Sequence, residues 1–393
     1  MLDIPSLQEE LARRNLDGWL LYDFKGQNPT AQTALGVHGH MVTRRWFYLV
    51  PRTGAPTLLL HAIEKDNLPP LPGERQTYAG HEQLGARLKA LLSGRARVAM
   101  EYCPLGAIPY LSRVDAGTVE LVRSFGPEVV SSADLVQLQL CRWDDVALKS
   151  HERASAGVYA AVQRAFKFVR DEHAAGRAPL ETVVMDQILA EYAARGMITD
   201  HPPIVAVNAH AGNPHFVTGS GGPTPVKRGD LLLLDVWAKE NDPRHAYADI
   251  TWMGVVDDAV RNPRHEEVFR VVADGRDAAL ELIRREHSMG RRVKGFEADR
   301  AARDLIASRG YGEKFVHRTG HNIGCDADHG DGAHLDDFET HDTRELMPRT
   351  CFSIEPGVYL EDFGVRSEID VYLAEDGPKV FTPIQHDLVR VLG

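Results

Sequence analysis

Cysteine is scarce in this sequence, and the few cysteines are not spaced in pairs. The 393 residues include only four, Cys103, Cys141, Cys325 and Cys351, and none belongs to a C-x-x-C motif. This density is far below that of disulfide-stapled domains, so we expect reduced thiols in a cytoplasmic environment. The first ten residues also lack the basic and apolar regions of a signal peptide, which favours the same location.

Long apolar runs, an excess of positive charge and low-complexity segments are also missing. No stretch approaches the roughly 18 apolar residues of a membrane span. The formal net charge of −11 argues against a nucleic-acid or anionic-membrane surface, so we expect neither kind of partner. With 43% hydrophobic and 26% charged residues, the composition is that of a globular protein, and at this length two domains are expected.

Residues 1–143 are predicted to form an α/β domain, because strand-like segments alternate there with helical patterns. The expected strands are 19–24, 46–50, 57–61, 97–102 and 119–124, and the expected helices include 81–92 and 131–142. His38 and His40 have the spacing of metal ligands. No carboxylate lies near them in the sequence, so we interpret them as surface-loop residues.

From residue 144 onward, the pattern changes to long helices mixed with strands. Apolar positions at helical spacing predict helices over 144–170, 180–194, 263–286 and 297–308. Strands are predicted at 203–208, 231–238 and 247–256 and again toward the C-terminus. Runs of strands beside long helices indicate that residues 144–393 form an α+β domain.

Two strands of this second domain each carry an aspartate. Four leucines precede Asp235, and Asp249 follows in another apolar stretch, with strong turn chemistry at 241–244 between them. The midpoint of the two aspartates is residue 242, so an antiparallel hairpin would place their side chains directly opposite each other. Directly opposed Cβ atoms lie about 4.5–5.5 Å apart, which lets two carboxylates reach the same cation.

Two glutamates repeat this arrangement near the C-terminus. The apolar run 351–354 leads to Glu355, and Glu368 lies in the strand-like stretch 365–373, with turn residues midway between them at 361–364. A carboxylate inside an apolar strand is costly unless it is paired or binds a cation. Four such carboxylates meeting in one core would be neutralised by two divalent ions.

A histidine supplies the nitrogen ligand for such a site. His321 lies between Gly320 and Gly324, and glycines allow close approach of the backbone. One imidazole and four carboxylates form a hard-donor set that suits Mn²⁺, with Co²⁺ or Zn²⁺ as alternatives. Two ions about 3.5–4 Å apart can bind a bridging hydroxide and polarise a carbonyl. The residues therefore predict metal-assisted hydrolysis, with an amide as the favoured substrate.

These motifs resemble those of the pita-bread-fold metallopeptidases, which include methionine aminopeptidase, aminopeptidase P and prolidase (Xaa-Pro dipeptidase). The resemblance rests on Asp235, Asp249-Ile250-Thr251, Gly320-His321-Asn322-Ile323-Gly324, Glu355-Pro356-Gly357 and Arg366-Ser367-Glu368. The N-terminal part resembles the creatinase/prolidase-type domain, which methionine aminopeptidases lack. The resemblance thus implies a pita-bread catalytic domain over 144–393, preceded by a smaller creatinase/prolidase-like α/β domain over 1–143.

The resemblance also implies roles for individual side chains. The expected ligands of a dinuclear centre are Asp235, Asp249, His321, Glu355 and Glu368. His215 and His317 match histidines on the substrate side of the family's site, where they can donate hydrogen bonds to the scissile carbonyl or the tetrahedral intermediate. The third such histidine of the family stands where this chain has Asp328. We assign its role to His329, one residue later, with His334 as the alternative.

Other residues beside the ligands complete or alter the expected pocket. Glu355 is expected to handle protons in addition to binding metal, as the resemblance implies. Arg366 is expected either to orient the Glu368 carboxylate or hold a substrate carboxylate, or else to form a structural salt bridge. Trp237 and Trp252 depart from the glycine and arginine that the family usually has at these positions, but neither removes a ligand.

We predict a dinuclear metallopeptidase that cleaves Xaa-Pro bonds, preferentially in dipeptides, through a metal-bridging hydroxide. The Xaa-Pro amide lacks the N–H that ordinary peptidases bind, which is a chemical reason for a dedicated enzyme. Aminopeptidase P, acting on longer Xaa-Pro-Yaa peptides, is the alternative within the class. A creatinase-like or lyase enzyme, or a binding module without catalysis, is the alternative outside it. The resemblance also suggests a homodimer.

Overall fold

The computed structural model describes residues 2–393, and the chain divides into two compact units, Met1–Cys141 and Arg142–Gly393. This division lies two residues before the predicted boundary between 143 and 144. Among the described residues, no helix is both long enough and apolar enough to cross a bilayer. Each unit has its own apolar core.

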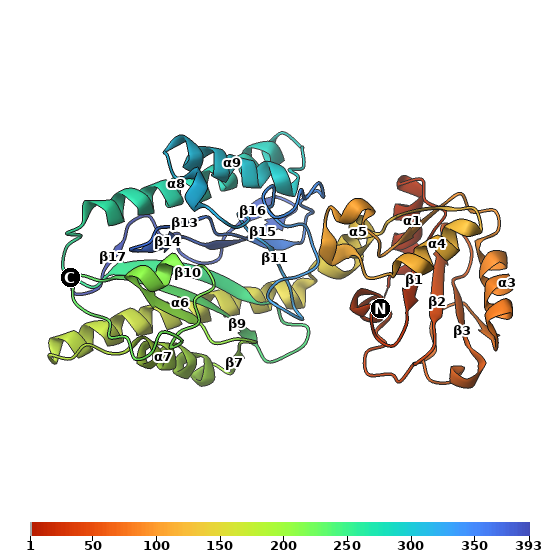
Figure 1. The fold of residues 1–393 in the computed structure, drawn as a ribbon, viewed down its shortest axis with the longest axis horizontal. Helices are drawn as coiled ribbons and strands as arrows, with labels where there is room; N and C mark the ends of the chain where they lie inside the picture. Colours follow the sequence, from red (N-terminus) through yellow and green to blue (C-terminus); the bar gives the residue numbers. More distant parts are fainter. Residues whose placement is uncertain (1) are drawn as a thin grey trace. The chain divides into compact units, whose positions relative to one another are not determined.

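The N-terminal unit is built around one six-stranded mixed sheet with the order β4-β3-β2-β1-β5-β6 (Figure 1). The strands are β1 (Gly18–Asp23), β2 (Trp46–Pro51), β3 (Thr57–His61), β4 (Glu74–Tyr78), β5 (Arg97–Met100) and β6 (Glu128–Ser131). Most of the apolar side chains that cover it come from four helices, α1 (Ile4–Arg13), α2 (Pro29–Leu35), α3 (His81–Leu92) and α4 (Ala116–Ser124), and the short helix α5 (Ala133–Val136) adds two more. Side chains of α1 and α2 share one core cluster with the sheet, and those of α3 and α4 share a second.

One predicted strand of this unit is wrong, because residues 119–124 belong to helix α4. The side chain of Asp115 caps this helix by accepting a 2.8 Å hydrogen bond from the backbone N–H of Thr118. Thr118, Val119 and Val122 are buried, which is the spacing of one helix face. The β-branched residues in this segment suggested a strand, but the cap and the helical period determine its structure.

His38 and His40 lie exposed on the N-terminal unit and contact different groups. His38 Nε2 is 2.7 Å from the hydroxyl of Thr33, and His40 Nδ1 is 2.9 Å from the carbonyl oxygen of Asn67. Neither belongs to a group of possible metal ligands among the described residues. Their position agrees with the surface-loop interpretation.

The C-terminal unit places its strands between two pairs of helices (Figure 1). The helices are α6 (Asp145–Ala174), α7 (Glu181–Ala194), α8 (Pro263–Ser288) and α9 (Gly295–Ser308). A five-stranded sheet contains β7 (Met197–Ile198), β8 (Ile204–Val207), β9 (Leu231–Glu240), β10 (Ala248–Val255) and β17 (Val389–Arg390). A four-stranded sheet contains β11 (Asn322–Ile323), β12 (Cys351–Ile354), β15 (Ile369–Ala374) and β16 (Gly377–Lys379). β13 (Gly357–Tyr359) and β14 (Gly364–Arg366) form a separate pair.

Strand β9 is apolar on both faces, which explains its unbroken run of leucines. Leu232 and Leu234 pack in one core cluster with side chains of α6 and α7. Leu231 and Leu233 pack in another with side chains of α8. Because side chains alternate along a strand, Asp235 shares the face of Leu231 and Leu233 and points into the interior of the unit.

The antiparallel hairpin of β9 and β10 is present, but the predicted direct opposition of its two aspartates is wrong. Asp235 pairs with Thr251, and Asp249 pairs with Trp237, so the two carboxylates are diagonal neighbours. The ladder is centred on residue 243 rather than 242. A turn lies close to this centre, since the N–H of His245 donates to the carbonyl of Asp242 at 3.0 Å and Pro243 and Arg244 occupy its tip.

The second hairpin has the register that the sequence suggested. Ile354 pairs with Ile369 at the end of the β12–β15 ladder, and Gly357 pairs with Arg366 at the start of the β13–β14 ladder. Both pairs belong to the same register, and Glu355 and Glu368 lie opposite each other between them. The acid pair therefore occupies the junction of two ladders.

Candidate metal centre

A close backbone contact fixes the position of His321. A Cβ atom on Gly320 would lie 2.0 Å from the carbonyl oxygen of Ser353, so only glycine fits there. The N–H of His321 donates to the hydroxyl of Ser353 at 3.0 Å, and the N–H of Ser353 donates to the carbonyl of His321 at 2.8 Å. The imidazole therefore projects from a rigid pair of adjacent segments.

His321 presents an unprotonated nitrogen to three carboxylates. Its Nδ1 lies 3.2 Å from the carbonyl oxygen of Asn322, which can only accept, so Nδ1 carries the proton. Burial holds the pKa of His321 well below its ordinary value and keeps the ring neutral. Nε2 lies 3.7 Å from Oδ2 of both Asp249 and Asp328 and 3.4 Å from Oε1 of Glu355. Atoms that each bind one ion at about 2.0–2.2 Å have such separations.

Asp249 and Glu368 each keep one buried oxygen free. Oδ1 of Asp249 and Oε1 of Glu368 have no hydrogen-bond partner among the described residues. With His321, these two residues offer ligand atoms that all lie within 4.8 Å of one another. Burial, reinforced by the neighbouring carboxylates, raises the pKa of Asp249 and of Glu368 well above the ordinary range. A divalent cation would supply the missing partner and favour the ionised forms, so these residues fit a metal site.

Asp235 joins this cluster through an arginine and a threonine. Nη2 of Arg366 donates to Oδ2 of Asp235. The Thr251 hydroxyl lies 3.2 Å from Oδ1 of Asp235 and 2.8 Å from Oε2 of Glu368, so it connects the two hairpins. Arg366 thus forms the salt bridge that was one of its predicted alternatives, and the partner is Asp235 rather than Glu368.

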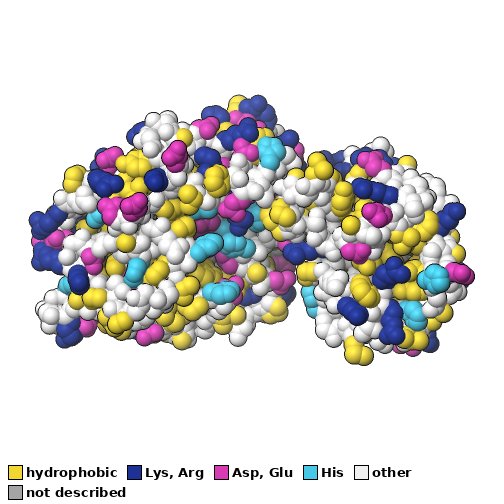
Figure 2. All heavy atoms as spheres, viewed as in Figure 1, with side chains coloured by type: hydrophobic (Ala, Val, Ile, Leu, Met, Phe, Trp, Pro, Cys, Tyr) yellow, Lys and Arg dark blue, Asp and Glu magenta, His cyan; other side chains and the backbone are white. Residues whose placement is uncertain are grey.

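Most of the predicted residues surround one cavity of about 560 Å³. Its lining includes four expected ligands and the other four candidate side chains: Asp235, Asp249, His321, Glu355, His215, His317, His329 and Arg366. Glu368, the fifth expected ligand, is buried and does not line the cavity. Figure 2 shows histidine and acidic side chains gathered near the middle of this unit's visible face. Trp237 also borders the cavity and donates from Nε1 to Asp200 at 2.7 Å.

His317 is engaged through both ring nitrogens. Its Nδ1 is 2.7 Å from the carbonyl oxygen of Arg318, so Nδ1 carries the proton. Burial lowers the pKa of His317 to about 3, so Nε2 is unprotonated and accepts a 2.7 Å hydrogen bond from the Tyr359 hydroxyl. That hydroxyl in turn accepts from Nη1 of Arg366 at 3.1 Å. Tyr359 was missed in the sequence, although it lies only four residues after Glu355.

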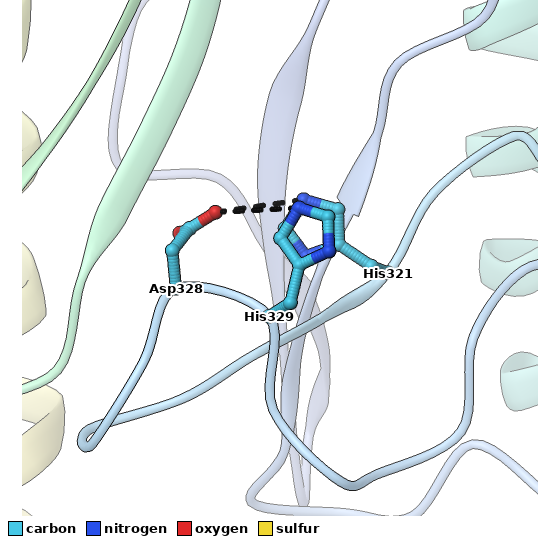
Figure 3. Close-up of side chains that lie close together, drawn as sticks. All are labelled: His321, Asp328 and His329. Carbon is cyan, nitrogen blue, oxygen red and sulfur yellow. Dashed lines mark ion pairs between the residues drawn. The ribbon is translucent and has the colours of Figure 1, made fainter. Parts of the chain in front are cut away.

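His329 borders the cavity, whereas His334 does not. The His329 ring stacks on His321, with ring centroids 3.7 Å apart, and Figure 3 shows both rings beside the Asp328 carboxylate. His334 is buried and accepts a 2.9 Å hydrogen bond from the N–H of Asn322. Asp328 was not predicted as a site residue. The only signal for it in the sequence was its position, where the family has a histidine.

The class that this arrangement defines is a metallopeptidase, and a comparison with family models agrees. Residues 149–375 match the model described as metallopeptidase family M24. The chain belongs to this family, because the match covers more than half of it. The fold and the recognition made from the motifs are thereby confirmed at the level of the family.

Individual relatives are more distant. The chain is 31% identical over 188 residues to an Xaa-Pro dipeptidase of Lactobacillus helveticus, covering 47% of this chain and 45% of that protein. It is 29% identical over 187 residues to an Xaa-Pro dipeptidase of Pyrococcus furiosus, covering 47% of this chain and 48% of that protein. The match thus spans about half the length of these relatives.

Solved structures show the same fold along almost the whole chain. Dipeptidase PepE from Mycobacterium ulcerans has a TM-score of 0.68 at 20% identity and covers 98% of this chain and 96% of its own. The prolidase from Pyrococcus horikoshii has a TM-score of 0.62 at 21% identity, and the match covers 98% of this chain and 99% of the prolidase chain. The C-terminal unit therefore has the predicted α+β pita-bread fold.

Proposed function

We propose that this protein is a dinuclear metal-dependent Xaa-Pro dipeptidase. The observation that carries the proposal is the position of the unprotonated Nε2 of His321, which faces three carboxylate oxygens at 3.4–3.7 Å, an arrangement that a shared cation would stabilise. The names of the relatives that match about half of the chain support the substrate class. Family membership supports metal dependence.

The residues that would hold the ions are Asp235, Asp249, His321, Glu355 and Glu368. When bound, a pair of divalent ions activates water and polarises the scissile carbonyl. The carboxylate-rich donor set favours Mn²⁺ among the candidate ions, with Co²⁺ and Zn²⁺ as alternatives.

Glu355 is the proposed proton carrier. Its side chain is 17% exposed and borders the cavity, whereas the side chain of Asp249 is 8% exposed. Glu355 is therefore the more exposed of these two acids, and we assign to it the exchange of protons with the attacking water and the leaving proline nitrogen.

Hydrogen bonds to the developing oxyanion would come from His215 and His329. Nη2 of Arg318 lies 3.0 Å from Nδ1 of His329 and donates to it, so the proton of the neutral ring is on Nε2. His329 thus has an N–H available toward the cavity. Both nitrogens of His317 are engaged, so we assign it to positioning Tyr359, and we assign Arg366 to positioning Asp235.

A paired peptidase assay tests the function. Purified protein supplemented with Mn²⁺ should hydrolyse Xaa-Pro dipeptides, and Asp249→Ala should abolish the activity, while Asp258→Ala, at an exposed position beyond β10, should keep it. Cleavage of Xaa-Pro-Yaa tripeptides alone would make the protein an aminopeptidase P. Lack of both activities in the metal-loaded protein would favour a small-molecule enzyme on this fold and contradict the proposal.

We also propose a cytoplasmic homodimer. The four cysteines form no disulfide with one another in the described residues, which suits a reducing compartment, and the homodimer is proposed from the family resemblance. Light scattering on the purified protein should give twice the 43.6 kDa mass of one chain. A monomer at micromolar concentration would contradict the proposed assembly.

A further inference from the structure

Asp328 is buried although its own loop is exposed. Its side chain turns inward while Asp326, two residues earlier, remains in solvent. The loop is closed by a 3.0 Å hydrogen bond from the N–H of Gly324 to the carbonyl of Asp328. A Cβ on Gly324 would lie 2.5 Å from the carbonyl oxygen of Ala327, so the glycine permits this tight closure. The backbone therefore holds the Asp328 carboxylate in the interior.

Apart from a contact with the side chain of Asp249, itself an acid, the buried carboxylate of Asp328 has no matching donor. Oδ1 has no hydrogen-bond partner among the described residues. Oδ2 lies 3.7 Å from Nε2 of His321 and 3.7 Å from Nε2 of His329, and Figure 3 shows it directed toward both rings. These separations are too long for hydrogen bonds. A residue only 5% exposed needs compensation for a buried charge, and these contacts do not provide it.

The two histidines face Asp328 with different atoms. His321 presents a lone pair, because its proton is on Nδ1. His329 presents an N–H, because Arg318 donates to its Nδ1. His329 can thus approach Asp328 only as a hydrogen-bond donor. By contrast, His321 Nε2 and an ionised Asp328 Oδ2 both offer electron pairs, and two such atoms are stable side by side when they share a cation.

We propose that Asp328 is a sixth side chain of the metal centre, binding on the His321 side of the site. The inference rests on the proposed metal-dependent function and adds an oxygen ligand that the family pattern does not include. An additional carboxylate should strengthen binding of a hard, oxygen-preferring ion such as Mn²⁺. It should thereby reduce the difference in affinity by which such sites ordinarily favour Zn²⁺ over Mn²⁺.

Metal titration of the full chain tests this inference without relying on activity. Asp328→Asn keeps the shape of the side chain and removes its charge, and we expect Mn²⁺ affinity measured by calorimetry to fall about 10–100-fold, the loss that even outer groups of metal sites cause. Asp328→Glu keeps the carboxylate and should lose less. Asp326→Asn removes an exposed charge from the same loop and should bind as the wild type does.

A second ligand variant separates this inference from the proposed function. If Asp249→Asn weakens Mn²⁺ binding and Asp328→Asn stays within twofold of the wild type, the metal centre stands and the role of Asp328 is refuted. If the wild type binds no Mn²⁺, both proposals fail. The spectrum of bound Co²⁺ gives a further readout, since loss of a ligand should change its visible bands in Asp328→Asn and leave them unchanged in Asp326→Asn.

Discussion

Replacing Arg366 by methionine should destabilise the metal-free protein strongly. Arg366 is 5% exposed, and its guanidinium donates to Asp235, to the Thr251 hydroxyl at 3.1 Å, to the Tyr359 hydroxyl at 3.1 Å and to the Pro214 carbonyl at 3.3 Å. Methionine fills much of the same volume but provides no donor and no charge. The Asp235 carboxylate would then remain buried among other acids.

The size of the effect follows from the burial of the pair. Removing one partner of a buried ion pair typically costs about 3–5 kcal/mol, because the other charge is left uncompensated. For a domain of this size, 1 kcal/mol changes the melting temperature by about 2–4 °C. We therefore expect the melting temperature of Arg366→Met in chelator to fall by about 6–20 °C.

Thermal unfolding with and without Mn²⁺ checks both the cost and its cause. Bound cations should neutralise Asp235, so the difference between Arg366→Met and the wild type should shrink when Mn²⁺ is present. Arg264→Met removes an exposed arginine that lies 3.2 Å from Asp362, and such surface pairs contribute about 0–1 kcal/mol. A loss at Arg366 no larger than at Arg264, or an equal loss with and without Mn²⁺, would refute this account.

Three further predictions concern other buried contacts of the C-terminal unit. Burial lowers the pKa of His151 from 6.5 to about 4. The free energy of unfolding should therefore fall by about 3 kcal/mol as the pH drops from 6.5 to 4, measured in urea as the difference between the wild type and His151→Gln. The same pH dependence in both proteins would contradict this prediction. Gly320→Ala should cost about 1–3 kcal/mol or more, because its methyl group would strike the Ser353 carbonyl, and an unchanged melting temperature would count against this. Tyr359→Phe removes the donor to His317 and should lower kcat while Mn²⁺ affinity stays unchanged. A kcat equal to that of the wild type would contradict the proposed positioning role of His317 and Tyr359.

The elements that could be predicted from the sequence are those with a local signal. The leucine run before Asp235 predicted β9, because a strand buried on both faces needs apolar residues at every position. The helical spacing of small and apolar side chains predicted α6 to within a few residues. The segment 119–124 was mistaken for a strand because its composition favoured β structure, while its cap at Asp115 was overlooked.

The midpoint between two acids predicted the register correctly in only one of the two hairpins. Glu355 and Glu368 face each other as their midpoint implied, because two consecutive ladders share that register. Asp235 and Asp249 are offset because the ladder is centred on residue 243 rather than 242, and a one-residue move of the centre shifts the pairing by two. The offset keeps both carboxylates on one face, since side chains alternate with a period of two. The predicted ligands therefore still meet, although the predicted pairing was wrong.

The protonation pattern of the site could not have been predicted, because it depends on contacts between segments far apart in the sequence. His317 is an acceptor because Tyr359 approaches it from β13, and Tyr359 is held by Arg366. The same side chains in the same order would offer different donors if these segments were packed differently. A motif therefore specifies which groups reach a metal centre, and the packing of the strands determines which of them can donate a proton. This is why Asp328, which belongs to no motif, becomes important only when its buried oxygens are seen beside His321.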